Sequence, residues 1–255
     1  MQLVILAGGL GSRISEETQN KPKPLVEICG KPIIVHIMEH YANYGVKEFI
    51  ICCGYKGEML KDYFINFNEL NSDFSINLQN NKKGIYKKKK IDWNITLVDT
   101  GQKTNTGGRL KFVDKYLEDD FCMTYGDGIS SVNISKLIKF HFQKKKLATM
   151  TVVNPPVRFG EVEFNKNNKI ALRFEEKVKY SSSWINGGFF VINKKALKLI
   201  NSKKTAWEKE PLNKLVKNKN LACFEHKGFW RAMDSLRDKQ EIESIFKFKR
   251  YLLKK

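Results

Sequence analysis

A glycine-rich turn with two basic residues close behind it is the part of the sequence best suited to chemistry. Residues 8–11 hold three glycines and directly follow the apolar run 3–7, which is typical of a strand buried on both faces. Backbone N–H groups of such a turn can point into one concavity, and a phosphate can approach the main chain closely. Arg13 and Lys23 add positive charge beside the turn. The pattern predicts a site for a polyphosphate.

The turn matches neither of two common phosphate-binding motifs. Ile14 stands where the dinucleotide-binding fingerprint needs its third glycine, and the Gly-Lys-Ser/Thr of a Walker A loop is missing. The glycines by themselves are also compatible with a tight connection that binds no ligand. Ser12-Arg13 and Pro22-Lys23 favour the phosphate site over that alternative.

A second candidate is an aspartate between two glycines. Asp127 follows the apolar run 121–125 and lies within Gly126-Asp127-Gly128. At the carboxyl end of a parallel strand, such a side chain is well placed to hold a hard cation. The alternative is an Asx-turn at the end of the strand.

The glycine turn and Asp127 can lie together only if the strands before them are neighbours in one sheet, which an alternation of strands and helices would provide. Short apolar runs, glycine loops and helical patterns recur through residues 1–153, which predicts an α/β fold with a Rossmann-like, mixed and mostly parallel sheet. We expect a hairpin or loop insertion at residues 67–92. The expected strands are 2–7, 49–53, 94–98, 121–125 and 148–153, with helices beginning near residues 32, 56, 109 and 134.

Pro155-Pro156 interrupts this alternation, and the chain beyond it is richer in strands. We interpret residues 154–255 as a second half that continues the first within a single domain of residues 1–255. Its expected strands are 159–164, 169–174, 187–193 and 221–224, its short helices are 194–201 and 207–217, and a charged helical tail covers 235–255.

The composition narrows the class of protein. A chain of 255 residues with 42% hydrophobic residues can bury a large core and needs no disulfide bonds or structural metal for stability. No run is long and apolar enough to span a membrane, and because Met1-Gln2 leads directly into the first strand we expect no signal peptide. Five cysteines without a C-x-x-C pattern indicate reduced thiols in the cytoplasm. Adjacent Cys52 and Cys53 should point to opposite faces of a strand.

The formal net charge of +19 raises the question of a nucleic-acid partner. The lysines are spread along the chain, and no DNA- or RNA-binding motif with interleaved aromatic residues is present, so we expect no nucleic-acid partner. The cluster within residues 82–90 is either a solvated loop or a contact for an anion. In both cases a basic surface attracts nucleotides and sugar phosphates.

One short motif suggests zinc. His36 and His40 fit the pattern H-x-x-E-H, and on a helix both side chains would share a face. No third ligand is evident, and the polar face of an amphipathic helix explains the stretch equally well.

Further stretches accompany the glycine turn in a fixed order, and together they resemble a known family. Over nearly its whole length the chain is similar to the sugar-1-phosphate nucleotidyltransferases, and within them to the branch of glucose-1-phosphate cytidylyltransferases. The stretches that carry the resemblance are residues 8–13, 15–18, 21–24, 30–33, 50–57, 97–101, 106–110, 125–128, 184–190, 207–212 and 229–234.

The resemblance implies a nucleotide-diphospho-sugar transferase type of fold, a strand-rich sugar-binding half and Mg²⁺ as the cofactor. Arg13 and Lys23 would be catalytic and would stabilise charge on the triphosphate, while Asp127 and Asp234 would hold the metal. The nucleotide-binding residues that it implies are Leu6, Ala7, Gly8, Gly9, Leu10, Gly11, Ser12, Arg13, Lys23, Thr104, Arg109 and Gly126.

On the sugar side, the resemblance implies that Lys177 binds the sugar phosphate and Glu176 a sugar hydroxyl. Val178 stands where the family has proline, and because valine leaves the backbone freer, we expect a looser loop. Arg231-Ala232 replace a Gln-Pro pair of the family. The sugar-phosphate residues implied are Glu176, Lys177, Asn186 and Gly187.

The reaction implied is cytidylyl transfer from CTP to α-D-glucose 1-phosphate, with release of diphosphate. The attacking phosphate oxygen is already ionised, so no general base is needed, and positioning and charge neutralisation carry the catalysis. The alternatives are another nucleoside triphosphate such as UTP or dTTP, another sugar 1-phosphate, or a binding protein without turnover. The resemblance also implies a homo-oligomer, whose product feeds deoxysugar synthesis for surface polysaccharides.

Overall fold

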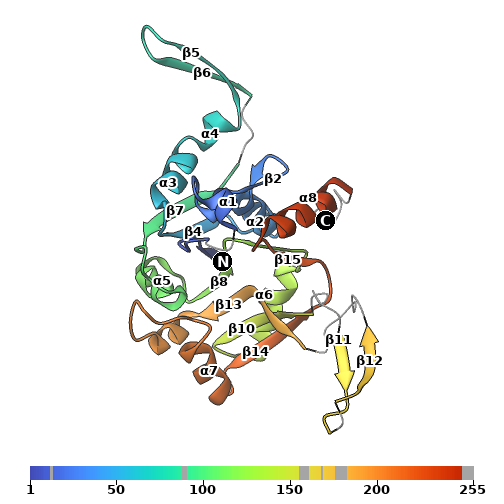
Figure 1. The fold of residues 1–255 in the computed structure, drawn as a ribbon. Helices are drawn as coiled ribbons and strands as arrows, with labels where there is room; N and C mark the ends of the chain where they lie inside the picture. The colour runs from blue at the N-terminus through green and yellow to red at the C-terminus, as the bar shows by residue number, and fades with distance from the viewer. Residues whose placement is uncertain (12–13, 88–90, 155–160, 168, 176–182, 249–255) are drawn as a thin grey trace.

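A computed structural model of the protein describes residues 1–11, 14–87, 91–154, 161–167, 169–175 and 183–248, and a seven-stranded sheet runs through its centre (Figure 1). The strands lie in the order β14-β10-β13-β8-β1-β4-β7. Their bounds are β1 (Gln2–Leu6), β4 (Glu48–Cys53), β7 (Asn94–Asp99), β8 (Asp120–Tyr125), β10 (Ala148–Val153), β13 (Ile185–Asn193) and β14 (Leu221–His226).

One strand of this sheet runs against the others. β13 is antiparallel to both of its neighbours, β8 and β10, whereas the remaining pairs are parallel. The predicted fold class, a mixed and mostly parallel α/β sheet, is therefore confirmed. Leu6 of β1 pairs with Cys52 of β4 and Tyr125 of β8, so these strands end at the same edge, where the glycine turn and Gly126 follow.

Each side of the sheet packs in its own core. In β1, Leu3 and Ile5 belong to one buried cluster, while Val4 and Leu6 belong to the other. All four are buried because successive side chains of a strand point to opposite faces and both faces are covered. Cys52 and Cys53 are divided between the two clusters in the same way, as their adjacency predicted.

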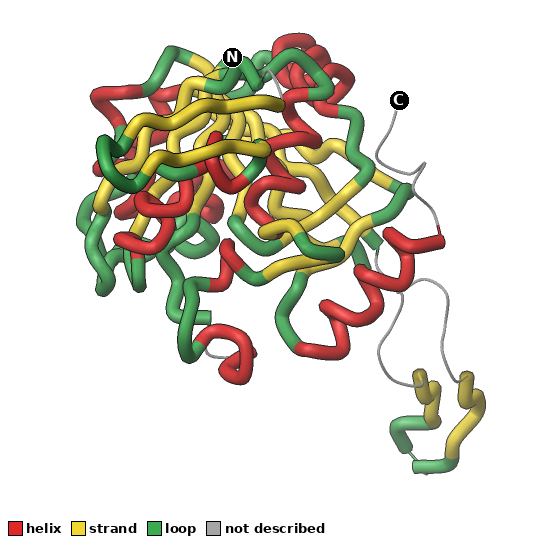
Figure 2. Tube along the Cα trace, turned by 90° about the horizontal axis from the view of Figure 1, so that it is seen from above, coloured by secondary structure: helices red, strands yellow, loops and turns green. Residues whose placement is uncertain are grey.

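Helices cover both faces of the sheet (Figures 1 and 2). Side chains of α2 (Ile33–Ala42), α6 (Ile134–Lys144) and α8 (Leu236–Phe248) pack in the first cluster. Side chains of α5 (Thr106–Phe112), α7 (Glu210–Lys217) and the 3₁₀ helix η4 (Lys194–Leu199) pack in the second. Within the described ranges, no helix has both the length and the apolar character needed to cross a membrane.

Shorter elements complete the fold, and two hairpins project from the body in Figure 1. One of them, β5–β6, occupies the stretch where a hairpin or loop insertion was expected. The helical pieces are α1 (Ser15–Thr18), η2 (Lys23–Leu25), α3 (Gly57–Ile65), α4 (Phe67–Leu70) and η3 (Asp114–Tyr116). The small strands are β2 (Glu27–Ile28), β3 (Lys31–Pro32), β5 (Asp73–Asn77), β6 (Lys82–Lys87), β9 (Gly128–Ser130), β11 (Glu161–Phe164), β12 (Ala171–Glu175) and β15 (Trp230–Ala232).

The helix expected from about Arg109 begins earlier, at Thr106, and includes two glycines. A Cβ on Gly107 would lie 2.8 Å from the Thr205 carbonyl oxygen, and one on Gly108 would lie 2.4 Å from that of Lys203. The chain at residues 203–207 packs directly on the helix backbone, so a residue with a side chain would not fit at either position without a shift. Tertiary packing overrides the low intrinsic helix propensity of these glycines.

Other boundaries differ from expectation by a few residues. Pro32 ends β3 and precedes α2, the segment after residue 193 is a 3₁₀ helix, α7 begins at Glu210, and β14 extends to His226. Element ends are where local sequence signals are weakest. Residues 159–160 of one expected strand and residues 249–255 of the expected tail lie outside the described residues.

Candidate active site

A cavity of about 450 Å³ opens at the edge of the sheet where β1 and β8 end. In parallel α/β sheets, ligands bind outside the carboxyl ends of the strands. Twelve of the residues implied by the resemblance line it: Leu6, Ala7, Gly8, Gly9, Leu10, Gly11, Lys23, Thr104, Arg109, Gly126, Asp127 and Asp234.

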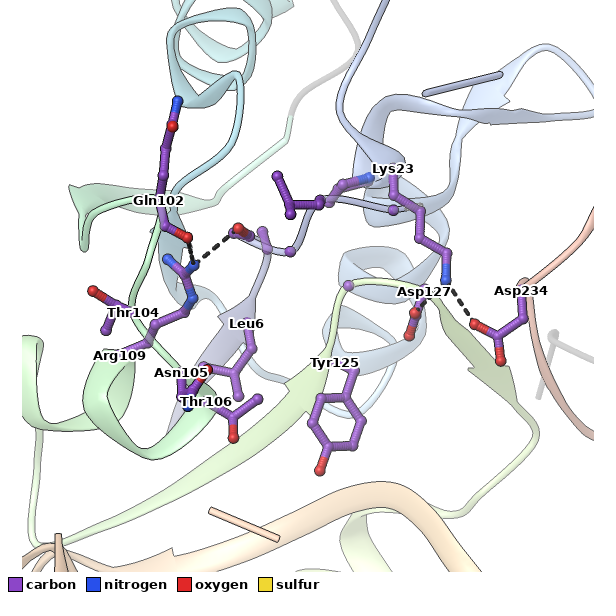
Figure 3. Close-up of a pocket in the computed structure, with 17 residues that line it drawn as sticks. Leu6, Lys23, Gln102, Thr104, Asn105, Thr106, Arg109, Tyr125, Asp127 and Asp234 are labelled. Carbon is purple, nitrogen blue, oxygen red and sulfur yellow. Dashed lines mark hydrogen bonds and ion pairs between the residues drawn. The ribbon is translucent and has the colours of Figure 1, made fainter. Parts of the chain in front are cut away.

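Lys23 connects the two carboxylates expected to hold a metal (Figure 3). Its Nζ donates to Asp127 Oδ2 at 2.7 Å and to Asp234 Oδ1 at 2.9 Å. Burial lowers the pKa of Lys23, but the charges and hydrogen bonds of the two aspartates outweigh it, so the pKa of Lys23 is raised. The ammonium group therefore stays charged between the carboxylates.

A small sheet brings these aspartates together from distant parts of the chain. β9 pairs antiparallel with β15, which places Gly128 opposite Ala232. The Met233 N–H donates to the carbonyl oxygen of Asp127 at 2.9 Å. This pairing holds Asp127 and Asp234 at the same wall of the cavity although they are 107 positions apart.

The aspartate pair fits a hard divalent cation. Both carboxylates reach one ammonium nitrogen, so a single cation can contact both, and carboxylate oxygen is the ligand that Mg²⁺ prefers. Each side chain is also about 30% exposed toward the cavity, at 29% for Asp127 and 30% for Asp234. The site offers these two carboxylates alone, because no group of three or more His, Cys, Asp or Glu side chains gathers anywhere among the described residues.

The two histidines of the H-x-x-E-H pattern have separate partners. His36 Nε2 bonds the carbonyl of Ile28, and His40 Nε2 bonds that of Val132. Burial lowers the pKa of His40 to about 4, so this ring stays neutral at physiological pH. The two rings join α2 to β2 and to the segment after β9. The stretch is helical as expected, but His40 is buried and does not lie on an exposed polar face.

The phosphate turn adopts a backbone shape that favours glycine. Gly11 has a φ of +67°, a left-handed conformation that other residues rarely adopt. Thr18 of α1 donates its hydroxyl toward the carbonyls of Gly11 and Ile14, which fastens the loop after the turn. Ser12 and Arg13 lie outside the described residues, so their predicted contacts stay predictions.

Arg109 bonds the protein through most of its guanidinium. Nη1 donates to the Cys53 carbonyl and to Thr100 Oγ1, and Nη2 donates to the carbonyls of Gly8 and Gln102. The side chain lines the cavity, yet Arg109 is only 4% exposed. Burial lowers the pKa of Arg109. The expected direct contact between Arg109 and a substrate stays a prediction.

A polar cluster forms another wall of the cavity. Tyr125 Oη donates to Glu208 Oε1 at 2.6 Å, and Thr106 Oγ1 donates to Glu208 Oε2 at 2.6 Å. Asn186 Nδ2 contacts the Tyr125 hydroxyl at 3.4 Å. Burial first, and then the Glu208 charge, raise the pKa of Tyr125. Glu208 thus ties Tyr125 of β8 to the first residue of α5.

Five cavity residues were not identified from the sequence: Pro24, Gln102, Asn105, Thr106 and Tyr125. Each lies within three residues of a predicted one, and Tyr125 and Thr106 stand in stretches that carry the resemblance. Their closeness in sequence to the predicted residues was the signal that could have identified them.

The predicted sugar-side residues are only partly described. Asn186 Oδ1 accepts from the Gly188 N–H, and the carbonyl of Gly187 accepts from Trp230 Nε1 at 2.7 Å. Both residues belong to β13, and Asn186 approaches the cavity through Tyr125. Glu176, Lys177 and Val178 lie outside the described residues.

The chain is similar to known proteins over nearly its whole length. The family model described as nucleotidyl transferase matches residues 2–242. Over 248 residues the chain is 48% identical to a protein of Salmonella typhimurium LT2 named glucose-1-phosphate cytidylyltransferase, with 96% of each chain covered. It is 38% identical to a protein of Bacillus subtilis named probable glucose-1-phosphate cytidylyltransferase, again with 96% of each covered.

Solved structures support the same fold. The crystal structure of HddC from Yersinia pseudotuberculosis has a TM-score of 0.70 at 23% identity, and the match covers 96% of this chain and 99% of that one. A complex of the same protein with GMP-PN matches equally well. At 23% identity, the similarity to these structures shows a shared fold and nothing further.

Proposed function

Because the chain belongs to the nucleotidyl transferase family, we propose that this enzyme transfers a cytidylyl group from CTP to α-D-glucose 1-phosphate, giving CDP-glucose and diphosphate. The observation that carries the proposal is the high identity, over nearly the whole chain, to relatives named for this activity. The cavity supports it, since it combines a glycine turn with a lysine and two carboxylates.

The glycine turn and its cations would hold the triphosphate of CTP. Backbone N–H groups of residues 8–11 and the hydroxyl of Ser12 would donate to phosphate oxygens, while Leu6, Ala7, Leu10, Thr104, Arg109 and Gly126 would line the nucleotide site. Arg13 and Lys23 would stabilise negative charge on the α-phosphate and on the departing diphosphate. The sugar phosphate oxygen attacks as an anion, so the protein contributes by alignment and by reducing repulsion between two polyanions.

Asp127 and Asp234 would hold Mg²⁺. When bound, the ion would supply positive charge shared by the nucleotide and the sugar phosphate. The two side chains would orient that charge at the end of β8, next to the glycine turn. Their convergence on Lys23 supports this assignment, because one compact cation already contacts both.

The sugar phosphate would bind on the side of β13. We assign residues 1–153 to the nucleotide-binding half and 154–255 to the sugar-binding half of a single domain. Lys177 would bind the sugar phosphate and Glu176 a hydroxyl, while Asn186 and Gly187 would complete the site. The contact between Asn186 and the cavity residue Tyr125 supports a sugar site continuous with the cavity.

We propose that the enzyme acts in the cytoplasm. Cys29, Cys52, Cys53, Cys122 and Cys223 are all free thiols. Free thiols are usual in a reducing compartment such as the cytoplasm.

A diphosphate-release assay that crosses the four common nucleoside triphosphates with several sugar 1-phosphates tests the reaction. We expect CTP with glucose 1-phosphate to give the highest kcat/KM, because a pocket that hydrogen-bonds one group can reject its analogue strongly. A higher kcat/KM with UTP, dTTP or another sugar would reassign the substrates. If no combination of nucleoside triphosphate and sugar 1-phosphate released diphosphate, the result would contradict nucleotidyl transfer.

We further propose that the enzyme is a homo-oligomer in which the β5–β6 hairpin meets a second copy. Phe74 and Ile76, on one face of β5, are 45% and 43% exposed, and Leu78 at the hairpin loop is 83% exposed. A two-stranded hairpin on its own is marginally stable in water, so packing of these apolar side chains against a second copy would stabilise it.

Light scattering should therefore give a mass well above the 29.6 kDa of one chain. Replacing both Phe74 and Ile76 by serine should shift the mass toward one chain, because the apolar contact is lost. Ile170→Ser, an exposed residue near the other hairpin, is the matched control and should leave the mass unchanged. A wild-type mass near that of one chain would refute the oligomer.

A further inference from the structure

The guanidinium of Arg109 joins the ends of three strands beneath the phosphate turn. It bonds the carbonyl of Gly8 after β1 at 2.9 Å and that of Cys53 in β4 at 3.0 Å. It also bonds Thr100 Oγ1 at 2.5 Å and the Gln102 carbonyl at 3.4 Å, both after β7. Four of the five N–H donors of a guanidinium are thus used on neutral oxygens of the protein.

Two glycines make room for this group. A Cβ on Gly8 would lie 2.1 Å from Arg109 Nη1, and a Cβ on Gly54 would lie 2.6 Å from the same atom and 2.7 Å from the Gly8 carbonyl oxygen. At such distances the guanidinium or the Gly8 carbonyl would have to move to admit a Cβ. Gly8, Gly54 and Arg109 therefore form one packed unit, which we call the arginine clamp.

The arginine clamp sets the direction of one peptide group. The carbonyl of Gly8 accepts from Arg109 Nη2 and from the Tyr55 N–H at 3.3 Å. No described peptide bond is cis, so the N–H of Gly9 points opposite to that carbonyl, away from the guanidinium. Gly9 is exposed and lines the cavity. A carbonyl bonded to a cation also polarises its peptide, which strengthens the N–H as a donor.

We propose that Arg109 is a positioning residue that presents the Gly9 N–H to the phosphate chain of the nucleotide, and that Gly54 is required because it admits the guanidinium. The proposal deepens the proposed function and rests on it. Gly54 is not among the described residues that line the cavity, but a Cβ there would press on both Arg109 and the Gly8 peptide, so Gly54→Ala disturbs the clamp as a unit and Arg109→Ala isolates the guanidinium. The clamp differs from a substrate contact, since removing it misdirects a donor and leaves the other cavity side chains in place.

Gly54→Ala tests the proposal. We expect the Kd for CTP, measured by titration calorimetry, to rise about tenfold or more, the scale of one lost hydrogen bond to a charged group. The KM for the sugar 1-phosphate should stay unchanged. Gly57→Ala is the matched control, because its Cβ would also be crowded, at 2.9 Å from the Cys53 Cβ, but makes no contact with Arg109. Equal CTP affinity in the two variants would overturn the proposal.

Arg109→Ala gives a second measurement if the first variant folds poorly. Added guanidinium chloride at low millimolar concentration should recover part of the lost CTP affinity, because the free ion can bond the same carbonyls. Arg109→Lys should lose as much affinity as Arg109→Ala, since one ammonium cannot reach all four acceptors. Unchanged CTP affinity in Arg109→Ala, or full rescue by lysine, would overturn the proposal.

Inorganic tripolyphosphate, used as a second probe, separates this inference from the proposed function. The Gly9 N–H would serve any phosphate chain, so Gly54→Ala should weaken tripolyphosphate as it weakens CTP. If the wild type binds tripolyphosphate but not CTP, the cytidylyl assignment fails while the clamp is still tested by the variants. If the wild type binds neither, both proposals are refuted.

Discussion

Asp127→Asn is expected to lower kcat by about 10²–10³-fold, the loss that follows removal of one preorganised electrostatic group. The carboxylate shares a single cation with Asp234, so the amide would remove half of the negative charge available to Mg²⁺. Folding should change little, because the side chain is 29% exposed and Lys23 keeps its bond to Asp234. Asp234→Asn should lower kcat by a similar factor, because it removes the other carboxylate of the pair.

Steady-state assays over a range of Mg²⁺ concentrations, with thermal unfolding in parallel, would test this prediction. Asp92→Asn is the control, because this aspartate is 83% exposed and pairs with Lys47 on the surface. Its kcat should equal that of the wild type. Wild-type rates in Asp127→Asn or Asp234→Asn would contradict the metal assignment.

Lys23→Ala is expected to raise the KM for CTP and lower kcat together, with a combined loss in kcat/KM of about 10³-fold. The ammonium lies in the cavity beside the glycine turn, where it would neutralise phosphate charge in the bound state and as diphosphate leaves. Lys47→Ala is the control, since that lysine forms only an exposed ion pair. A fall in thermal stability alone would contradict the role in phosphate binding.

The same variant should bind divalent metal more tightly in the absence of nucleotide. Without the ammonium, Asp127 and Asp234 face each other uncompensated, and an added cation relieves their repulsion. Titration with Mn²⁺, followed by electron paramagnetic resonance, should show a lower Kd for Lys23→Ala than for the wild type. A Kd that did not fall would mean that the two carboxylates do not form one cation site.

Much of the site could be predicted because it lies close to strand ends. The glycine turn and Asp127 each follow an apolar run, and parallel strands bring such ends to one edge. Asp234 carries no such signal. Asp234 reaches the cavity because β15 pairs with β9, and no local sequence pattern predicts that pairing. Only the resemblance to the family identified Asp234 as a site residue.

Contacts between distant segments account for what the sequence did not reveal. Gly107 and Gly108 indicated a loop, but they lie within α5, where the chain at 203–207 packs on them. Glu208 stood in a stretch that carried the resemblance, yet its bonds to Tyr125 and Thr106 depend on that same packing. The guanidinium of Arg109 likewise bonds the ends of three strands, a position that spacing along the chain does not encode.

The position of β13 between β8 and β10 has a consequence for how such enzymes diversify. A strand of the carboxyl-terminal half completes the sheet of the amino-terminal half, and residues 203–208 brace the helix beside the phosphate turn. Recombination at residue 153 would place a β13 of different sequence beside β8 and a different segment against α5. An exchange of halves would therefore succeed only where the strand pairing of β13 and the packing on α5 both match.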